Sequence, residues 1–334
     1  MDEKIIFPGK DGEKYVSPDK RSGEVSTVYF TRDLSPEGII KLFKRVSAPL
    51  TGSNIAIKLH TGEQNGPNFI PSAWVKKFMA EALPDATIIE TNTYYEGDRY
   101  TTELHRETLK VNGWDFAPVD ILDEDGVVAL PVNGGKWFTE MHMGANITKY
   151  DSMLALTHFK GHTSGGFGGS NKNIGIGLAD GRIGKKEIHT QVGSDNQWSI
   201  KKEEFMERMT ESTKAALDYF ENRVTFINVM RNMSVDCDCD GKSAAPVVTP
   251  NIGILASTDI LAVDSACIDC VYALRNRDKA ALVERIESRH GLRQLTYMKE
   301  LSMGNDCYTL IDTDNDDAVI TAADAVSGVL PFRG

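Results

Sequence analysis

The sequence predicts an α/β fold in which helices flank a mostly parallel sheet. From Val25 onward, short segments rich in β-branched residues alternate with segments of helical periodicity, which is the pattern of successive βαβ units. One segment, SMLALTHF at 152–159, is almost entirely apolar, as is typical of a strand buried on both faces. We therefore assign 25–334 to one α/β domain. The alternative is two α/β lobes, at about 25–145 and 146–334, with the site between them.

Predicted strands and helices alternate most clearly in the first half of the chain. Residues 1–24 are polar without a clear period, so we expect a loose N-terminal arm. Ser35 followed by Pro36 indicates a helix start, because serine caps the first turn and proline fits its first position. The predicted strands are 25–30, 54–59, 86–91 and 116–122, the predicted helices are 35–46, 72–83 and 98–113, and 127–132 is a short hairpin arm.

The second half is less regular but continues the pattern. Cys267 and Cys270 lie three residues apart in a helical segment, which places both thiols on one face, where small core residues lie. The predicted strands are 152–159, 224–230, 251–257 and 307–312, and the predicted helices are 201–221, 259–274, 278–290 and 293–302.

Composition and charge exclude several classes of partner. The 334 residues carry a formal net charge of −11, which argues against nucleic acid or an anionic membrane surface as the main partner. No run approaches the roughly 18 apolar residues of a membrane span, and the N-terminus lacks a leader pattern. Five cysteines, an odd number, fit a reducing compartment. We expect a cytoplasmic protein.

A glycine-rich segment follows the buried strand and reads HFKGHTSGGFGGSNKNIGIG at 158–177. Strands of α/β sheets end at the face where ligands bind, and glycines let a ligand approach the backbone. We expect His162 to transfer protons with a pKa near its usual value of about 6.5, and Lys172 to hold a cofactor or an anionic group. The expected ligand-binding residues of the segment are His158, Lys160, Gly165, Gly166, Gly168, Gly169, Asn171 and Asn173. A flexible connection with surface histidines is the alternative.

Ionisable residues also stand at the ends of two earlier strands. Lys58 and Glu63 follow one strand, while Glu90 and Asn92 end the next, so they should converge on the same face. We expect Lys58 and Glu90 to be catalytic, and Glu63 and Asn92 to bind the ligand. A surface pair between Lys58 and Glu63 is the alternative. His105, on a predicted helix, is expected to be solvated.

The segment VDCDCDG offers two thiols two residues apart, which could hold a soft metal. Two ligands do not complete a tetrahedral site. We expect Cys237 and Cys239 to bind a metal ion, nickel or zinc, to which a family resemblance given below adds His189.

Six segments together resemble the domain-of-unknown-function family 362 over nearly all of the chain from about Val25. They are YFTR (29–32), IKLHTGE (57–63), ETNT (90–93), the glycine-rich segment, VDCDC (235–239) and NIGILASTDILAVDSA (251–266). Many members carry an inserted ferredoxin module with two four-iron four-sulfur clusters after a K-x-x-x-H segment. Here only TQVGSDNQW separates His189 from the next helix, so an iron–sulfur cluster is not expected.

The glycine-rich segment is also similar to the H-F-F-A-G-F-S-G-G-R-K loop of lactate-racemase-type proteins, which use a nickel-pincer nucleotide. With His162 on the histidine of that pattern, Gly166, Phe167, Gly169 and Lys172 match its glycine, phenylalanine, glycine and lysine without a gap. The resemblance implies proton transfer by His162, a cofactor on Lys172 and a metal on His189.

Together these patterns predict a cytoplasmic enzyme that binds a metal or a nucleotide-derived cofactor and a small anionic substrate, with racemase- or isomerase-like proton transfer. The alternative is a non-catalytic metal-binding protein that partners a redox protein and lacks the iron–sulfur clusters of its relatives.

Overall fold

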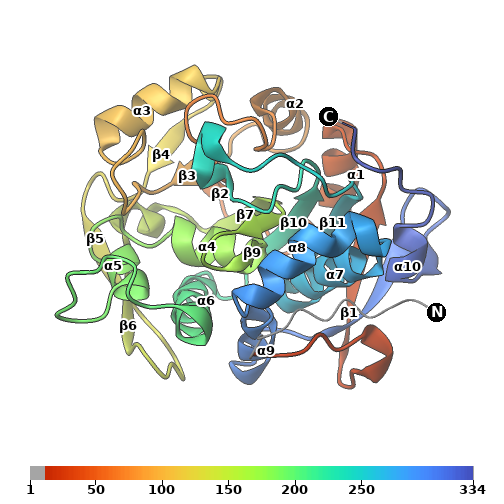
Figure 1. Ribbon diagram of the computed structural model, residues 1–334. Coiled ribbons are helices and arrows are strands. Elements are labelled where there is room, and N and C mark those ends of the chain that lie inside the picture. The colour runs from red at the N-terminus through yellow and green to blue at the C-terminus, as the bar shows by residue number, and fades with distance from the viewer. Residues whose placement is uncertain (1–11, 334) are drawn as a thin grey trace.

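A nine-stranded sheet forms the centre of the molecule, in the order β13-β12-β1-β11-β10-β7-β2-β3-β4 (Figure 1). The computed structural model describes residues 12–333. Five of the eight strand pairings are parallel, while β11 runs antiparallel to both of its neighbours and β13 antiparallel to β12. The predicted α/β fold with a mostly parallel sheet is therefore confirmed.

The strands of this sheet match the predicted segments closely. Their bounds are β1 (Val25–Thr31), β2 (Ile55–Lys58), β3 (Thr87–Glu90), β4 (Val119–Ile121), β7 (Ser152–His158), β10 (Val224–Met230), β11 (Gly253–Ser257), β12 (Cys307–Asp312) and β13 (Ala318–Ile320). Every residue of β7 is buried, as its apolar sequence predicts. The predicted arm at 127–132 is β5 (Val127–Pro131), which pairs with β6 (Glu140–Gly144) as a hairpin.

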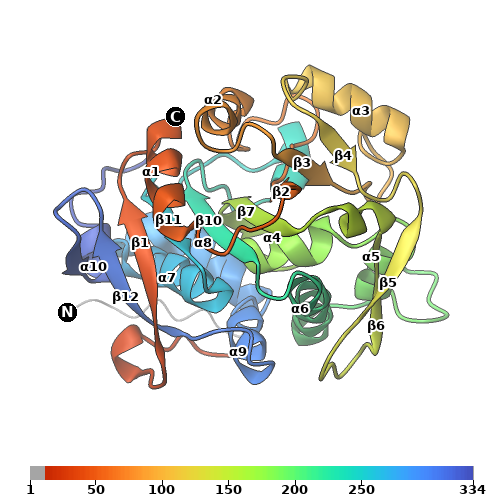
Figure 2. The ribbon, with the colours of Figure 1, turned by 180° about the vertical axis from the view of Figure 1, so that it is seen from behind.

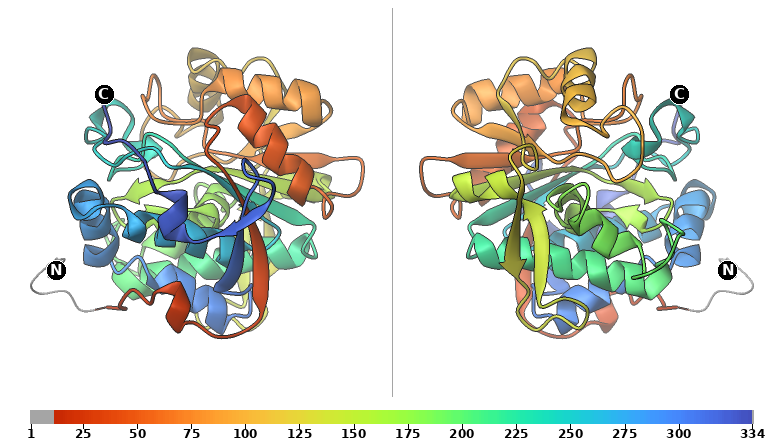
Figure 3. Two further views of the ribbon diagram at one scale, coloured as in Figure 1. Left: turned by 90° about the vertical axis from the view of Figure 1, so that its right-hand side faces the viewer. Right: turned by 90° about the vertical axis from the view of Figure 1, so that its left-hand side faces the viewer.

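Helices cover both faces of the sheet, which gives three layers (Figures 2 and 3). One face carries α1 (Pro36–Val46), α2 (Ser72–Ala82) and α3 (Thr102–Val111). The other carries α4 (Ser170–Gly177), α6 (Lys202–Tyr219), α7 (Ile260–Ala273), α8 (Asn276–Ser288) and α9 (Arg293–Glu300). Two short helices, α5 (Gly184–His189) and α10 (Ala322–Ala325), complete the set of described α-helices.

The two apolar cores explain why the strands read as continuous apolar runs. Successive strand residues point to opposite faces, so Ala56 packs in one core and Ile57 in the other. At α1, the Ser35 side chain accepts a hydrogen bond from the Gly38 amide, which confirms the predicted cap.

The glycine-rich segment is more ordered than a loop. It forms a tight hairpin of β8 (Lys160–His162) and β9 (Gly166–Gly168) and then continues as α4. Gly166 has φ +75, and a side chain there would meet Gly291 Cα at 2.8 Å. Helix α4 carries Lys172 and Asn173, so the hairpin and helix fix these side chains relative to His162.

The N-terminal residues that are described lie against α7. Arg21 donates two hydrogen bonds to Asp269, at 2.8 and 2.6 Å, and the Tyr15 hydroxyl donates to the same carboxylate. The loose arm predicted over 1–24 thus has an attached part at 12–24, while 1–11 lie outside the described residues. One sheet takes strands from both 25–145 and 146–334, and the division into two lobes stays a prediction.

No helix in the described residues combines the length and the apolar character that crossing a membrane requires.

Gly161 offers a test of how tightly the hairpin packs. Its amide donates to the Ser234 carbonyl at 2.8 Å, and a Cβ at this position would overlap the backbone of Val235. We expect Gly161→Ala to lower the free energy of unfolding by about 1–3 kcal/mol, because an added methyl group must displace backbone. Urea denaturation measures the effect.

The matched control is Gly97→Ala, where the nearest atom to the new methyl group is 3.5 Å away on the Tyr95 ring. That change should alter the stability by less than about 0.5 kcal/mol. Equal effects of the two substitutions would contradict the close approach of the hairpin to 234–235.

Candidate functional site

A cavity of about 510 Å³ lies at the carboxyl ends of β2, β3 and β7. Parallel strands converge at this edge of the sheet, so residues distant in sequence meet there. Its lining includes Lys58, His60, Glu90, Tyr94, Tyr95, Arg99, Lys160, His162, Gly168, Gly169, Lys172, Asn173, Lys185, His189, Trp198, Cys239 and Asp240. Most of the ionisable side chains in this wall are cations or imidazoles.

Three buried cations of the wall are paired with carboxylates. Lys58 Nζ lies 2.9 Å from Glu90, and Lys160 Nζ lies 2.9 Å from Asp238. Arg99 contacts Glu63 at 2.8 Å. Burial alone raises the pKa of Glu90, but the Lys58 and Arg99 charges dominate and hold that pKa well below its usual range.

Lys172 and Lys185 have no carboxylate partner within 4.0 Å among the described residues. Lys172 Nζ lies 3.7 Å from Cys237 Sγ. Lys185 donates to Thr91 Oγ1 at 2.7 Å and to the Asn92 carbonyl. Burial lowers the pKa of Lys185 to about 8. A buried ammonium without an anionic partner is costly, and an anionic ligand would relieve that cost.

His162 presents an N–H group to the thiols at the cavity wall. Its Nδ1 accepts hydrogen bonds from the backbone amides of Gly165, at 2.7 Å, and Ser164, at 3.2 Å. Because Nδ1 accepts, the proton of the neutral ring is on Nε2, which lies 3.9 Å from Cys239 Sγ. His162 is therefore a hydrogen-bond donor at this wall.

His189 has the opposite arrangement. Its Nδ1 donates to the Lys185 carbonyl at 2.7 Å, so the lone pair is on Nε2. The ring packs against Trp198 and Phe205, with centroids 4.9 and 5.0 Å away. Burial lowers the pKa of His189 to about 3, so the ring is neutral at pH 7. A neutral imidazole with a free Nε2 can act as a base or as a ligand.

The predicted ordinary pKa of His162 is not what the structure gives. Burial, with the nearby Lys172 ammonium, lowers the pKa of His162 to about 4. The sequence could not indicate this shift, because it depends on enclosure of the ring by other segments.

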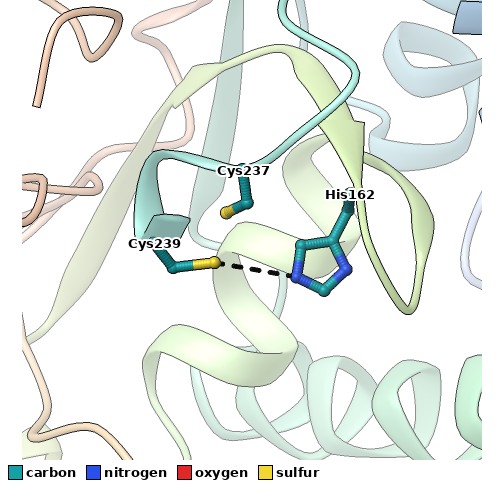
Figure 4. Close-up of side chains that lie close together, drawn as sticks. All are labelled: His162, Cys237 and Cys239. Carbon is teal, nitrogen blue, oxygen red and sulfur yellow. Dashed lines mark hydrogen bonds between the residues drawn. The ribbon is translucent and has the colours of Figure 1, made fainter. Parts of the chain in front are cut away.

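Cys237 and Cys239 lie beside His162 in one cluster (Figure 4). The ligand atoms of the three residues lie within 4.8 Å of one another, and two sulfurs with one imidazole are a donor set that zinc and nickel accept. A metal-bound imidazole needs its lone pair at the metal and its N–H on an outer acceptor. His162 has the reverse arrangement, so these three residues do not fit a metal bound by all of them.

The predicted site residues fall into two sets. Those that line the cavity are Lys58, Glu90, Lys160, His162, Gly168, Gly169, Lys172, Asn173, His189 and Cys239. Those that support it from behind are Glu63, Asn92, His158, Gly165, Gly166, Asn171 and Cys237. His189, which the sequence grouped with the two cysteines, is not part of their cluster in the described residues.

Several of the supporting residues fix the cavity wall. His158 donates through Nδ1 to Asp238 and through Nε2 to the Arg231 carbonyl, which ties β7 to the cysteine segment. Gln294, in α9, donates to the Gly165 and Phe167 carbonyls and accepts from the Asn171 amide.

Sequence reasoning missed other parts of the wall. Lys185 was visible only as the first residue of the K-x-x-x-H segment, while His60 stands with Lys58 and Glu63 at a strand end but was given no role. Arg99 precedes α3, and no sequence pattern marked it as a residue of the site. His105 was expected to be solvated, but it is fully buried beside Asn92, at 3.3 Å.

Comparisons with known proteins give a family and little else. The family described as Domain of unknown function (DUF362) matches residues 55–269, about two thirds of the chain. No curated protein matches.

Two solved structures are similar at 12% identity. The lactate racemase apoprotein from Thermoanaerobacterium thermosaccharolyticum matches with a TM-score of 0.39, over 94% of this chain and 93% of its own. A structural-genomics protein from Thermotoga maritima matches with a TM-score of 0.33, over 58% of this chain and 49% of its own.

The buried ion pairs of the cavity should matter for stability. Glu90→Gln removes the carboxylate that Lys58 and Arg99 share, and the side chains of the Lys58–Glu90 pair are only 1% and 3% exposed. We expect a loss of about 3–5 kcal/mol in the free energy of unfolding, because a buried charge is left uncompensated.

The control is Glu37→Gln, which breaks a pair with Lys77 whose side chains are about half exposed. This loss should be much smaller, because water screens an exposed ion pair. Chemical denaturation of both variants gives the comparison, and a small effect of Glu90→Gln would show that the cavity cations do not depend on it.

Proposed function

The chain belongs to the family Domain of unknown function (DUF362), and we propose that it is a cytoplasmic enzyme that binds a small anionic substrate in this cavity and moves a proton on it, as racemases and isomerases do. The observation that carries the proposal is that two buried imidazoles with opposite tautomers line the same cavity.

The tautomers favour distinct roles. His189 has a free Nε2 lone pair and is suited to accept a proton from the substrate. His162 has an Nε2–H and is suited to donate a hydrogen bond to a developing negative charge. The sequence suggested that His162 transfers protons and that His189 holds a metal, whereas this geometry favours His189 as the base.

The lysines support an anionic substrate. Lys172 and Lys185 are buried ammonium groups without carboxylate partners in the described residues, and both line the cavity. Lys58, at the end of β2, donates a hydrogen bond to Glu90, and both side chains contribute polar groups to the cavity lining. A carboxylate or phosphate of the substrate would give these two lysines, Lys172 and Lys185, the oxyanion partner that the described residues do not supply.

An organic cofactor is compatible with the cavity. Tyr94 and Trp198 pack edge to face, 5.6 Å apart, and both rings belong to the lining. A nucleotide-derived cofactor would supply the electron acceptance that removal of a proton from carbon needs, and Lys172, Tyr94 and Trp198 are the residues suited to hold it.

A second candidate function is non-catalytic metal binding, which the cluster of His162, Cys237 and Cys239 favours by its donor atoms. The His162 tautomer argues against it. Metal analysis of protein purified without oxygen separates the two functions, since a stoichiometric soft metal that both cysteines are needed to retain would support the second.

Proton transfer is tested by solvent exchange. We incubate the protein in deuterium oxide with a panel of 2-hydroxy and 2-amino acids and measure deuterium at carbon 2 by mass spectrometry. His189→Gln should slow exchange by at least about a hundredfold, because the base is lost. His142→Gln, the same change at a histidine paired with Glu187 outside the cavity lining, should not. Equal rates in the two variants would refute the role of His189.

Anion binding is tested by calorimetric titration with oxalate. Since the pKa of Lys185 is lowered to about 8, its ammonium is charged below that pH and loses its proton above it. Oxalate affinity should therefore fall as the pH rises through about 8. Lys185→Met should lower the affinity at pH 7 by about tenfold, the equivalent of one charged hydrogen bond.

The matched control is Lys186→Met, which removes an exposed neighbour on the same short helix. It should leave both the affinity and its pH dependence unchanged. An affinity that is insensitive to Lys185→Met would contradict the anion site.

A further inference from the structure

The two cysteines of the cavity wall lie on one short segment. Cys237 precedes the 3-10 helix Asp238–Ser243, and Cys239 lies within it. Their sulfur atoms lie within 4.8 Å of each other, and both cysteines are free thiols. Side-chain rotation over that distance can bring the two sulfurs to bonding contact.

The groups around the sulfurs favour a thiolate. The Cys239 thiol, the His162 and His60 imidazoles and the Lys172 ammonium all donate to or face Cys237. Hydrogen bonding from Cys239, followed by the Lys172 charge, outweighs burial and holds the pKa of Cys237 well below its usual range. Asp240 lies 4.0 Å from Cys239 Sγ and accepts a weak hydrogen bond from its thiol.

Access differs between the two sulfurs. Cys239 belongs to the cavity lining, whereas Cys237 is 1% exposed and lies behind it. The remaining cysteines have no such position. Cys267 and Cys270 are fully buried in α7, as predicted, and Cys307 begins β12.

We propose that Cys237 and Cys239 form a thiol–disulfide redox site at the cavity wall, which a low-molecular-weight disulfide oxidises, and that oxidation releases Lys172 to bind an anion. The redox site stands independently of the proposed function, whereas the release of Lys172 rests on it.

The chemistry balances in two exchanges. Cys239 transfers its proton to the Cys237 thiolate, and the Cys239 thiolate attacks one sulfur of the small disulfide, which breaks that S–S bond and expels a thiolate. The expelled thiolate then takes the proton from Cys237. Cys237 sulfur then attacks Cys239 sulfur, which forms the Cys237–Cys239 bond and expels the second thiolate. The protein loses two electrons and one proton, because Cys237 is already a thiolate, and the small disulfide takes these and one proton from solvent to become two thiols.

Oxidation changes the charge of the cavity. Within the described residues, Cys237 Sγ is the one hydrogen-bond partner of Lys172 Nζ, at 3.7 Å. A disulfide sulfur carries no charge, so Lys172 loses its anionic neighbour and the wall gains one net positive charge. A small anion should then bind more tightly.

The redox site is tested by counting thiols. The protein is equilibrated in buffers of oxidised and reduced glutathione, labelled with N-ethylmaleimide after denaturation, and weighed intact. The reduced protein should take five labels, one for each cysteine, and the oxidised protein three, that is five less two. Peptide mapping should find Cys237 joined to Cys239.

The matched control is Cys307→Ser, which removes a cysteine outside the cavity lining and should still lose two labels on oxidation. Five labels in the wild-type protein at the most oxidising ratio would overturn the redox site. A loss of two labels that persists in the Cys237→Ser/Cys239→Ser double variant would also overturn it. The wild-type count decides even where a variant does not fold.

The release of Lys172 is tested with oxalate. Affinity should rise several-fold on oxidation of the wild-type protein, and this dependence should vanish in Lys172→Met. Equal affinity in both redox states would overturn the release. Failure of oxalate to bind in either state would overturn the proposed anion site, while the thiol count would still decide the redox site.

Discussion

Buried positive charge is the constraint on which the rest of the site depends. The cavity wall holds five cationic side chains, namely Lys58, Arg99, Lys160, Lys172 and Lys185. A charge removed from water must be compensated by a partner, and the partners here come from different segments. Glu90 binds Lys58 across two parallel strands, and Asp238 ties Lys160 to the cysteine segment. The ion pairs thus hold the strand ends, the glycine hairpin and residues 237–240 around one cavity.

In the described part of the chain, only three of the five buried cations have a carboxylate partner, and the other two determine where an anionic ligand can bind. Lys172 faces a sulfur and Lys185 faces a hydroxyl and a carbonyl, so an anionic ligand has two ammonium groups to bind. His162 and His189 line the same cavity as opposite neutral tautomers. Hydrogen bonds with backbone groups, and not with other side chains, fix each tautomer. Backbone groups of the hairpin and of α5 therefore set which imidazole can accept a proton and which can donate a hydrogen bond.

Much of the fold could be predicted from sequence, because each prediction rested on local physics. The apolar run of β7, the Ser35 cap of α1 and the alternation of strands and helices each reflect the period of a single element. The convergence of Lys58 and Glu90 followed from strand ends alone. The glycine-rich segment was harder, since glycines carry no period. Its hairpin depends on close contacts with Gly291 and Val235, far along the chain. Burial of His105 and the low pKa of His162 likewise arise from enclosure by other segments.

The tautomers of His162 and His189 are the most direct test of the account. Nitrogen-15 correlation spectra of the labelled protein at pH 7, with the two rings assigned through single His→Gln variants, report which ring nitrogen carries the proton. We expect two neutral rings, with the proton on Nε2 of His162 and on Nδ1 of His189. The same tautomer on both rings, or a doubly protonated His162 at that pH, would contradict the division of roles between base and donor.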